Sequence, residues 1–176
     1  ELKKKKNVRL LAAEKLGEWQ RKGEGGREIK KIVGGMLLQD RDLSTETAQD
    51  GKIASVRKPT AEEMASLTFA WKISKHVRSN AIVLVSGTET VGIGAGQMSR
   101  VDSVKLAVMK AQKPLQGTVM ASDAFFPFRD GIDEAAKVGV VAAIHPGGSI
   151  KDQEVLDAAN QHNMAVVLTG VRHFKH

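Results

Sequence analysis

The sequence predicts an α/β fold of three layers built on a mixed sheet. From about residue 118 to residue 168, short apolar stretches alternate with helix-like segments. Strands separated by helices of this length pair in parallel through right-handed crossovers. Earlier in the chain, two apolar stretches flank Ser86-Gly87-Thr88-Glu89, which is the signal of an antiparallel hairpin. A sheet that contains both kinds of pairing is mixed.

The first 59 residues give the weakest signals of secondary structure. Val8–Ala13 is a short apolar run and is interpreted as a strand or its edge. Arg27–Leu38 is predicted as another strand, interrupted at Gly34-Gly35, and Gln39–Pro59 has the polar composition of a loop or linker. We therefore divide the chain into residues 1–59, with N-terminal strands and a polar linker, and residues 60–176, an α/β subdomain.

The second part begins with a helix and a hairpin. Thr60, followed by Glu62 and Glu63, predicts the start of a helix that runs to about Val77. Its apolar residues are so frequent that we expect it to be buried. They are Met64, Leu67, Phe69, Trp71 and Ile73. The hairpin strands are Ala81–Val85 and Thr90–Ile93, and Ser99 caps a predicted helix, Val101–Lys110, with Val104, Ala107 and Val108 on one face.

After Pro114 the predicted elements alternate regularly. They are strand Thr118–Ala121, helix Gly131–Ala136, strand Val140–Ile144, helix Asp152–His162 and strand Ala165–Leu168.

Composition excludes several classes of protein. The chain has 176 residues, 41% of them apolar, and no cysteine, so it is globular and holds neither disulfides nor thiolate metal sites. No apolar run is long enough to span a membrane, and we expect a soluble, cytoplasmic protein that binds no membrane. The net charge of +7 invites a nucleic-acid interpretation, but aromatic residues make up only 4% of the chain. Base-stacking platforms are therefore scarce, and we expect no nucleic-acid partner.

Four polar segments all lie where strands are expected to end, at the carboxyl edge on which an open α/β sheet builds its ligand site. They are Ser79-Asn80, Gly92–Arg100, Ser122–Asp130 and Arg172-His173-Phe174. Glycine lets the backbone approach an anion, arginine binds a phosphate or carboxylate, and phenylalanine provides a flat apolar wall. Together the segments predict a pocket for a flat, anionic small molecule.

Each of these segments also has a simpler interpretation. Gly92, Gly94 and Gly96 lack the spacing of a dinucleotide fingerprint, whereas Arg100 at a helix start is suited to an anion. Arg100 can equally pair with a nearby acid such as Asp102. Asp130 can accept from an amino-pyrimidine or pterin edge, or it can be an ordinary helix N-cap.

The histidines give no catalytic or metal-binding pattern. Lys75 and His76 are adjacent on a helix and therefore point about 100° apart. His145, before Pro146-Gly147-Gly148-Ser149, is weak evidence by itself, although the two glycines indicate a close approach of backbone to a ligand or to neighbouring chain. No histidine or cysteine spacing offers a zinc site, so no zinc is expected.

Five motifs give a resemblance to a known family. They are Ser79–Val83, Gly92–Arg100, Ser122–Asp130, Pro146–Ser149 and Arg172–His176. From about Leu2 to the last residue, the chain resembles the C-terminal part of the AICAR formyltransferase region of the bifunctional purine biosynthesis proteins. AICAR is phosphoribosylaminoimidazolecarboxamide, and the family's enzyme formylates its 5-amine with 10-formyltetrahydrofolate as cosubstrate. The resemblance implies a cytidine-deaminase-like fold that has lost its zinc, and a homodimer with sites across its interface.

The resemblance also implies a role for individual residues. Asn80, Arg100, Phe125 and Arg172 match positions that hold AICAR. The positions that line the folate match Val101, Asp130, Ser149 and Ile150.

The chain departs from the family pattern at the catalytic residues. The family's catalytic Lys-His pair lies in the preceding half of the transferase region, and Lys75-His76 falls at a different place. No catalytic residue is therefore expected in this chain, which we interpret as the second half of the formyltransferase, with the missing N-terminal half as its partner. The alternatives are a stand-alone nucleotide-binding or regulatory domain without catalysis, and a basic nucleic-acid-binding protein.

Overall fold

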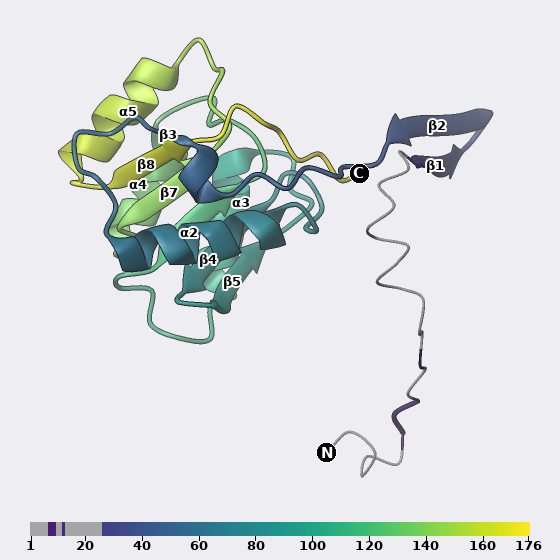
Figure 1. The fold of residues 1–176 in the computed structure, drawn as a ribbon, viewed down its shortest axis with the longest axis horizontal. Helices are drawn as coiled ribbons and strands as arrows, with labels where there is room; N and C mark the ends of the chain where they lie inside the picture. Colours follow the sequence, from purple (N-terminus) through teal and green to yellow (C-terminus); the bar gives the residue numbers. More distant parts are fainter. Residues whose placement is uncertain (1–6, 10–11, 13–25) are drawn as a thin grey trace. The chain divides into compact units, whose positions relative to one another are not determined.

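The computed structural model describes residues 7–9, 12 and 26–176. The chain divides into two compact units, residues 1–44 and 45–176, and each is described by itself (Figure 1). The strand predicted at Val8–Ala13 falls partly outside the described residues, and residues 8, 9 and 12, which are described, are not in a strand.

The first unit contains an antiparallel hairpin of β1 (Arg27–Ile32) and β2 (Gly35–Asp40). Our prediction of one interrupted strand was therefore wrong, because the chain reverses at the interruption. Ile32 pairs with Gly35, and Gly34 between them has a φ of 82°, which glycine adopts without strain. A two-residue turn and a bend within a strand produce the same pattern of glycines, so the sequence did not separate them.

The second unit is built on a six-stranded sheet with the order β3-β8-β7-β6-β4-β5. The strands are β3 (Lys52–Ile53), β4 (Ile82–Ser86), β5 (Glu89–Gly94), β6 (Val119–Ser122), β7 (Ala142–His145) and β8 (Ala165–Leu168). Strands β6, β7 and β8 pair in parallel, whereas β4 is antiparallel to both β5 and β6. The predicted mixed sheet is confirmed.

One strand of this sheet lies in the segment predicted as a loop. Strand β3, antiparallel to β8, and a short 3-10 helix, η2 (Ala48–Asp50), both fall between residues 39 and 59. A strand of two exposed residues has no apolar alternation to reveal it.

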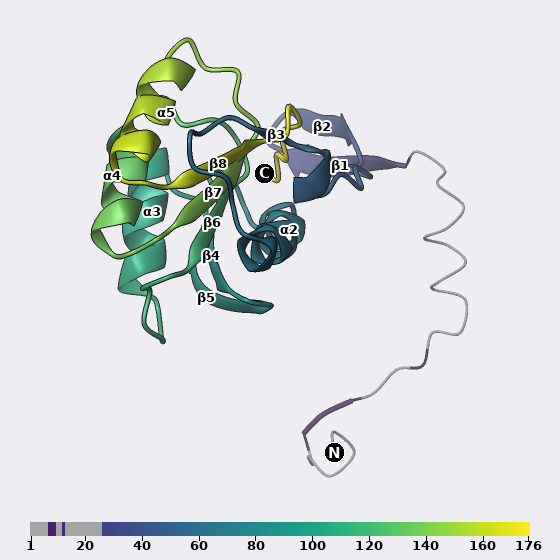
Figure 2. The ribbon, with the colours of Figure 1, turned by 60° about the vertical axis from the view of Figure 1, so that its left-hand side comes forward.

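Helices cover both faces of the sheet and complete three layers (Figure 2). Helix α2 (Ala61–Ser74) packs on one face around the buried Leu67 and Trp71. On the other face lie α3 (Arg100–Met109), α4 (Asp130–Lys137) and α5 (Asp152–Gln161).

The helix starts follow their capping residues. The Thr60 hydroxyl accepts from the Glu63 N–H at 3.1 Å, and the Glu63 carboxylate accepts from the Thr60 N–H at 2.8 Å. This reciprocal capping box begins α2 where predicted, although the helix ends at Ser74 rather than Val77. The Ser99 hydroxyl caps α3 by accepting from the Asp102 N–H at 3.2 Å, without the reciprocal bond found in α2.

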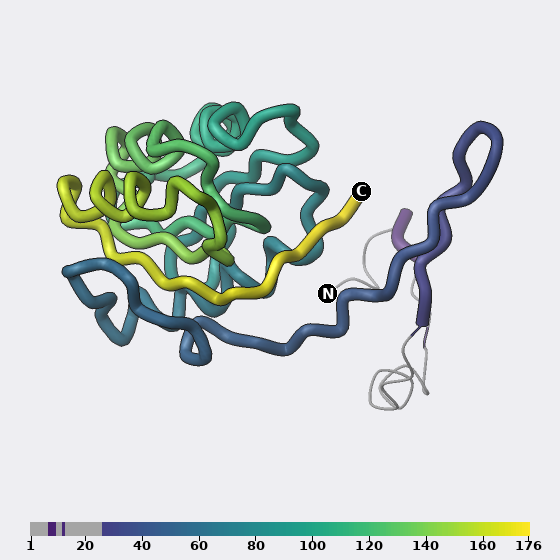
Figure 3. The backbone as a smooth tube through the Cα atoms, turned by 90° about the horizontal axis from the view of Figure 1, so that it is seen from above, coloured from purple at the N-terminus to yellow at the C-terminus, as the bar shows by residue number. Residues whose placement is uncertain are grey.

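The polar segments meet at one edge of the sheet. Strand β5 runs in the same direction as β6, β7 and β8, so all four end at this edge, and the antiparallel β4 begins there. Ser79-Asn80 therefore precedes a strand instead of following one. Beyond β8 the C-terminal segment leaves the sheet as an extended stretch (Figure 3).

Candidate ligand-binding pocket

A pocket of about 500 Å³ opens at this edge of the sheet. Its walls come from the start of β4, the start of α3, the loop after β6 and the C-terminal segment. The lining residues are Asn80, Met98, Ser99, Arg100, Val101, Ala124, Phe125, Pro127, Phe128, Asp130, Arg172 and Phe174.

Most of the site residues expected from sequence lie in this lining. All four residues assigned to AICAR are there, namely Asn80, Arg100, Phe125 and Arg172. Of the four assigned to folate, Val101 and Asp130 line the pocket, whereas Ser149 and Ile150 do not. Ile150 is fully exposed on the loop after β7.

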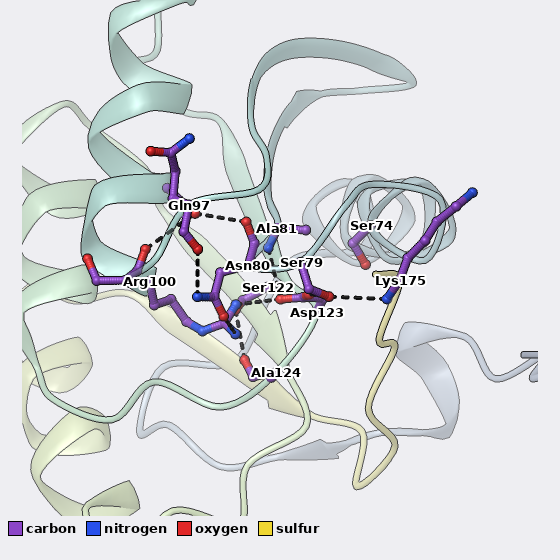
Figure 4. Close-up of polar contacts among 12 residues, drawn as sticks. Ser74, Ser79, Asn80, Ala81, Gln97, Arg100, Ser122, Asp123, Ala124 and Lys175 are labelled. Carbon is purple, nitrogen blue, oxygen red and sulfur yellow. Dashed lines mark hydrogen bonds and ion pairs between the residues drawn. The ribbon is translucent and has the colours of Figure 1, made fainter. Parts of the chain in front are cut away.

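A buried carboxylate organises the back of the pocket (Figure 4). Asp123 has no exposed surface, and one of its oxygens accepts from Arg100 Nη1 at 2.5 Å and from the Ala81 N–H at 3.1 Å. The other accepts from the Ser79 hydroxyl at 2.5 Å. The Ser79 hydroxyl also accepts from the Lys175 N–H at 3.2 Å. Asp123 thus joins the start of β4 to α3, and through Ser79 to the C-terminal segment.

The Arg100 guanidinium is buried and pairs with other side chains, rather than standing open to bind an anion. Besides Asp123, its guanidinium donates to the Ser122 hydroxyl and to Asn80 Oδ1, both at 2.8 Å. Asp102, the partner suggested by the alternative interpretation, instead accepts from the Ser99 hydroxyl at 2.6 Å. The alternative interpretation correctly predicted that Arg100 pairs with an acid. It suggested Asp102 instead of Asp123, because it considered only acids close in sequence.

Asn80 is held in the same framework. Its Nδ2 donates to the carbonyls of Gln97 and Met98, at 2.9 and 3.3 Å. The amide therefore fixes the loop before α3 as well as facing the pocket.

Arg172 and Phe125 form the open, ligand-accessible wall. The Arg172 guanidinium carbon lies 5.0 Å from the centre of the Phe125 ring, within the range of a cation–π contact. Within the described part of the chain, Arg172 makes no ion pair and donates no hydrogen bond, and its side chain is exposed. A flat aromatic face beside an uncommitted guanidinium suits a planar ring that carries an anionic substituent.

The aromatic cluster divides between core and pocket. Phe126 is buried in the core, while Phe125 and Phe128 line the pocket. Phe128 is 52% exposed, and Lys151 Nζ lies 5.3 Å from its ring centre. The resemblance singled out Phe125, whereas the residue pattern by itself did not separate the three phenylalanines.

Asp130 stands at the rim of the pocket and at the start of α4. The N-cap position belongs to Arg129, which corrects the proposal that Asp130 is the cap. Asp130 Oδ1 accepts from the Gly131 N–H at 2.8 Å, and within the described residues Oδ2 accepts no hydrogen bond. One carboxylate oxygen is thus left for a ligand.

Other ionisable groups lie outside the lining. Lys75 and His76 follow the end of α2, and neither borders the pocket. His162 and Arg129 both bond to Asp133, and these bonds lower the Asp133 pKa to about 2. His173 is buried, with its ring centre 4.3 Å from that of Trp71.

The described residues hold neither a metal-binding cluster nor a membrane-spanning helix. Among residues 7–9, 12 and 26–176, no three histidine or acidic side chains gather in a metal-binding group. Over the same residues, no helix has the length and apolar character needed to cross a bilayer.

Comparison with known proteins identifies the family. The model of the AICARFT/IMPCHase bienzyme family matches residues 1–110. The bifunctional purine biosynthesis protein PurH of Anaeromyxobacter sp. (strain Fw109-5) is 53% identical over 176 residues, and that of Anaeromyxobacter dehalogenans (strain 2CP-C) is 52% identical. Each match covers 98% of this chain and 34% of the relative, so the chain spans about a third of the length of these curated relatives. The chain belongs to the AICARFT/IMPCHase bienzyme family.

Proposed function

We propose that this chain is the second half of an AICAR formyltransferase and binds AICAR and 10-formyltetrahydrofolate side by side. The observation that carries the proposal is the single pocket lined by Asn80, Arg100, Phe125 and Arg172 on one side, with Asp130 at its rim. Membership of a purine biosynthesis family supports the same substrates.

The AICAR side of the pocket is built from Phe125 and Arg172. The aminoimidazole ring stacks on Phe125, and the Arg172 guanidinium binds the phosphate or the carboxamide oxygen. Asn80 accepts from Arg100, and Arg100 in turn is bonded to Asp123, so the two residues hold the wall in a fixed position for the ligand. Such preorganisation reduces the ordering that binding requires.

The folate side begins at Val101 and Asp130. The Asp130 carboxylate accepts from the N–H groups of the pterin edge, and Val101 contacts its flat face. Ser149 and Ile150 lie on the loop after β7, at the same edge of the sheet, and extend the folate side beyond the pocket. The exposed Ile150 is then covered by the cosubstrate or by a second subunit of the expected homodimer.

The chemistry is transfer of a formyl group between two nitrogens. The AICAR amine attacks the formyl carbon, a new C–N bond forms, and the bond to N10 of the folate breaks. The amine loses a proton and N10 gains one, which releases tetrahydrofolate. The pocket brings amine and formyl carbon together, which supplies proximity. The Lys-His pair that takes the proton is expected in the preceding half of the region.

Release of tetrahydrofolate tests this function. The chain alone, mixed with AICAR and 10-formyltetrahydrofolate, is expected to release none, and addition of the preceding half is expected to start turnover. Saturable AICAR binding without turnover in the combined protein would support a regulatory binding domain instead. Tight, strongly salt-dependent binding of single-stranded or duplex nucleic acid, with no AICAR binding, would support the nucleic-acid alternative.

A further inference from the structure

The last residue of β7, His145, is a buried polar side chain that the proposed chemistry does not use. It is 1% exposed, and its ring meets the Phe126 ring edge-on with 5.2 Å between the two centres. Its Nδ1 accepts a hydrogen bond from the Gly147 N–H at 3.1 Å. The ring therefore bonds to the turn that follows its own strand.

The direction of this bond fixes the tautomer. Because Nδ1 accepts, the proton of the neutral ring is on Nε2, which is buried and has no hydrogen-bond partner among the described residues. Burial lowers the His145 pKa to about 4; the positive charge of Arg100 acts in the same direction and the negative charge of Asp152 opposes it. The ring is therefore neutral, and remains an acceptor, throughout the physiological range.

The backbone N–H groups of the turn are paired by side chains. Gly147 and Gly148 have φ values of 70° and 92°, which other residues rarely adopt. His145 accepts from the first N–H, and the Asp152 carboxylate accepts from the Gly148 N–H at 2.6 Å and from the Ser149 N–H at 3.1 Å. Three successive backbone donors are thus paired with side chains, one at the end of β7 and one at the start of α5.

The same residue is also bonded to the segment that leads to Arg172. The His145 carbonyl accepts from the Thr169 N–H, and the Pro146 carbonyl accepts from the Gly170 N–H, both at 3.0 Å. A Cβ placed on Gly148 would lie 3.8 Å from Arg172 Nη2. The turn therefore packs beside the guanidinium and is bonded to the backbone two residues before it.

We propose that His145 is a positioning residue for anion binding: through Nδ1 it fixes the Gly147-Gly148 turn, and the turn holds the Arg172 guanidinium over Phe125. This inference rests on the proposed function for its ligand, the phosphate-bearing ribotide. The hydrogen bond and the turn do not depend on that function.

Two substitutions of equal size test the role of the acceptor. In His145→Asn, Oδ1 stands close to the former position of Nδ1 and can accept from Gly147. His145→Leu has the same branching without an acceptor. In the full-length protein, we expect His145→Leu to weaken AICAR binding by roughly three- to tenfold, as for loss of one hydrogen bond, and His145→Asn to retain most of the affinity. Calorimetric titration with AICAR measures both.

Amide hydrogen exchange at Gly147 gives a readout that needs no ligand. Exchange is expected to be faster in His145→Leu than in His145→Asn or the unchanged protein. If the leucine variant does not fold, nitrogen NMR of the unchanged protein shows which ring nitrogen of His145 carries the proton. A proton on Nδ1 would overturn the proposal.

The outcomes separate the positioning role from the function. Equal AICAR affinity in the leucine variant and the unchanged protein would overturn the positioning role, as would equal losses in both variants. If the unchanged protein binds no AICAR, the proposed function fails, and Gly147 exchange alone decides the role of His145. Equal exchange in the two variants would then overturn it.

Discussion

Arg100 and Asp123 form the ion pair on which the pocket wall is built. Their side chains are 6% and 0% exposed, so neither charge is solvated by water. Loss of one partner from such a pair leaves the other charge buried and uncompensated, which is more costly than the loss of the pair's own attraction.

We therefore expect Arg100→Ala to lower the free energy of unfolding by about 3–5 kcal/mol, besides disturbing the pocket. Arg129→Ala is the matched control, because Arg129 pairs with Asp133 where the two side chains are 39% and 26% exposed. That change is expected to cost less than about 1 kcal/mol. Urea denaturation of both variants measures the difference, and equal losses would mean that Asp123 is not the buried anchor described here.

The proposed function assigns Arg172 to AICAR and Asp130 to the folate, so substitution of each serves as the control for the other. Arg172→Ala is expected to raise the KM for AICAR by roughly tenfold or more, because a charged hydrogen bond is lost, with a smaller effect on the folate. Asp130→Ala is expected to show the reverse selectivity. Steady-state kinetics of the full-length enzyme, with each substrate varied separately, distinguish the two. Equal effects of either change on both substrates would contradict the division of the pocket.

His145 predicts a pH dependence of stability. Its pKa falls from the usual 6.5 to about 4 in the folded chain, because burial disfavours the charged ring. As pH drops below about 6.5, the unfolded chain binds a proton that the folded chain does not, so stability falls until both forms are protonated below about pH 4. The loss amounts to about 3 kcal/mol.

Urea denaturation between pH 7 and pH 4 measures this loss. His145→Asn has no titrating ring, so its stability is expected to fall less over the same interval. Asp133 does not obscure the comparison, because its lowered pKa of about 2 places most of its contribution at more acidic pH. Parallel curves for the variant and the unchanged protein would contradict a buried, neutral His145.

At the residue scale, sequence reasoning predicted types of contact better than partners. One of its interpretations anticipated that Arg100 pairs with an acid, and Arg100 does so. It could not find the pairing of Arg100 with Asp123, because the two residues are distant in sequence and meet only after β4, β6 and α3 have assembled.

At the scale of elements, two glycines of β5 explain how α3 lies so close to the sheet. A Cβ on Gly92 would lie 2.3 Å from the Ala107 carbonyl oxygen, and a Cβ on Gly94 would lie 1.8 Å from that of Ser103. Both contacts are with helix backbone, which cannot rotate away as a side chain can. These glycines serve the packing of α3, and the packing places Ser99 and Arg100 at the pocket.

Gly94→Ala is therefore expected to reduce the free energy of unfolding by about 3 kcal/mol or more, since α3 must move. Gly35→Ala in β2 is the control, because nothing lies within 4 Å of its Cβ position. It is expected to change stability by less than about 0.5 kcal/mol. Thermal or urea denaturation tests both. A Gly94→Ala protein as stable as the control would show that the helix approaches the sheet less closely.

The elements that the sequence predicted well are those with long, regular signals. Capping residues located the starts of α2 and α3, and the prediction of Ala165–Leu168 as a strand coincides with β8. The β1-β2 hairpin and the short β3 were missed. Their residues are exposed, so burial imposed no periodic pattern on them.

At the scale of the whole molecule, the direction of the strands brings the pocket together. Four strands end at one edge and β4 begins there, so segments that lie between residues 80 and 174 reach a single pocket. The position of this edge followed from alternation of strands and helices. The pairing of its residues did not, because hydrogen-bond partners depend on tertiary packing that composition and periodicity do not specify.

A crystal structure of the full-length protein with AICAR and a folate analogue is the strictest test of the proposed pocket. We expect AICAR stacked on Phe125, with its phosphate or carboxamide bonded to Arg172, and the pterin edge bonded to Asp130. AICAR bound at a site away from these residues, with this pocket empty, would contradict this expectation.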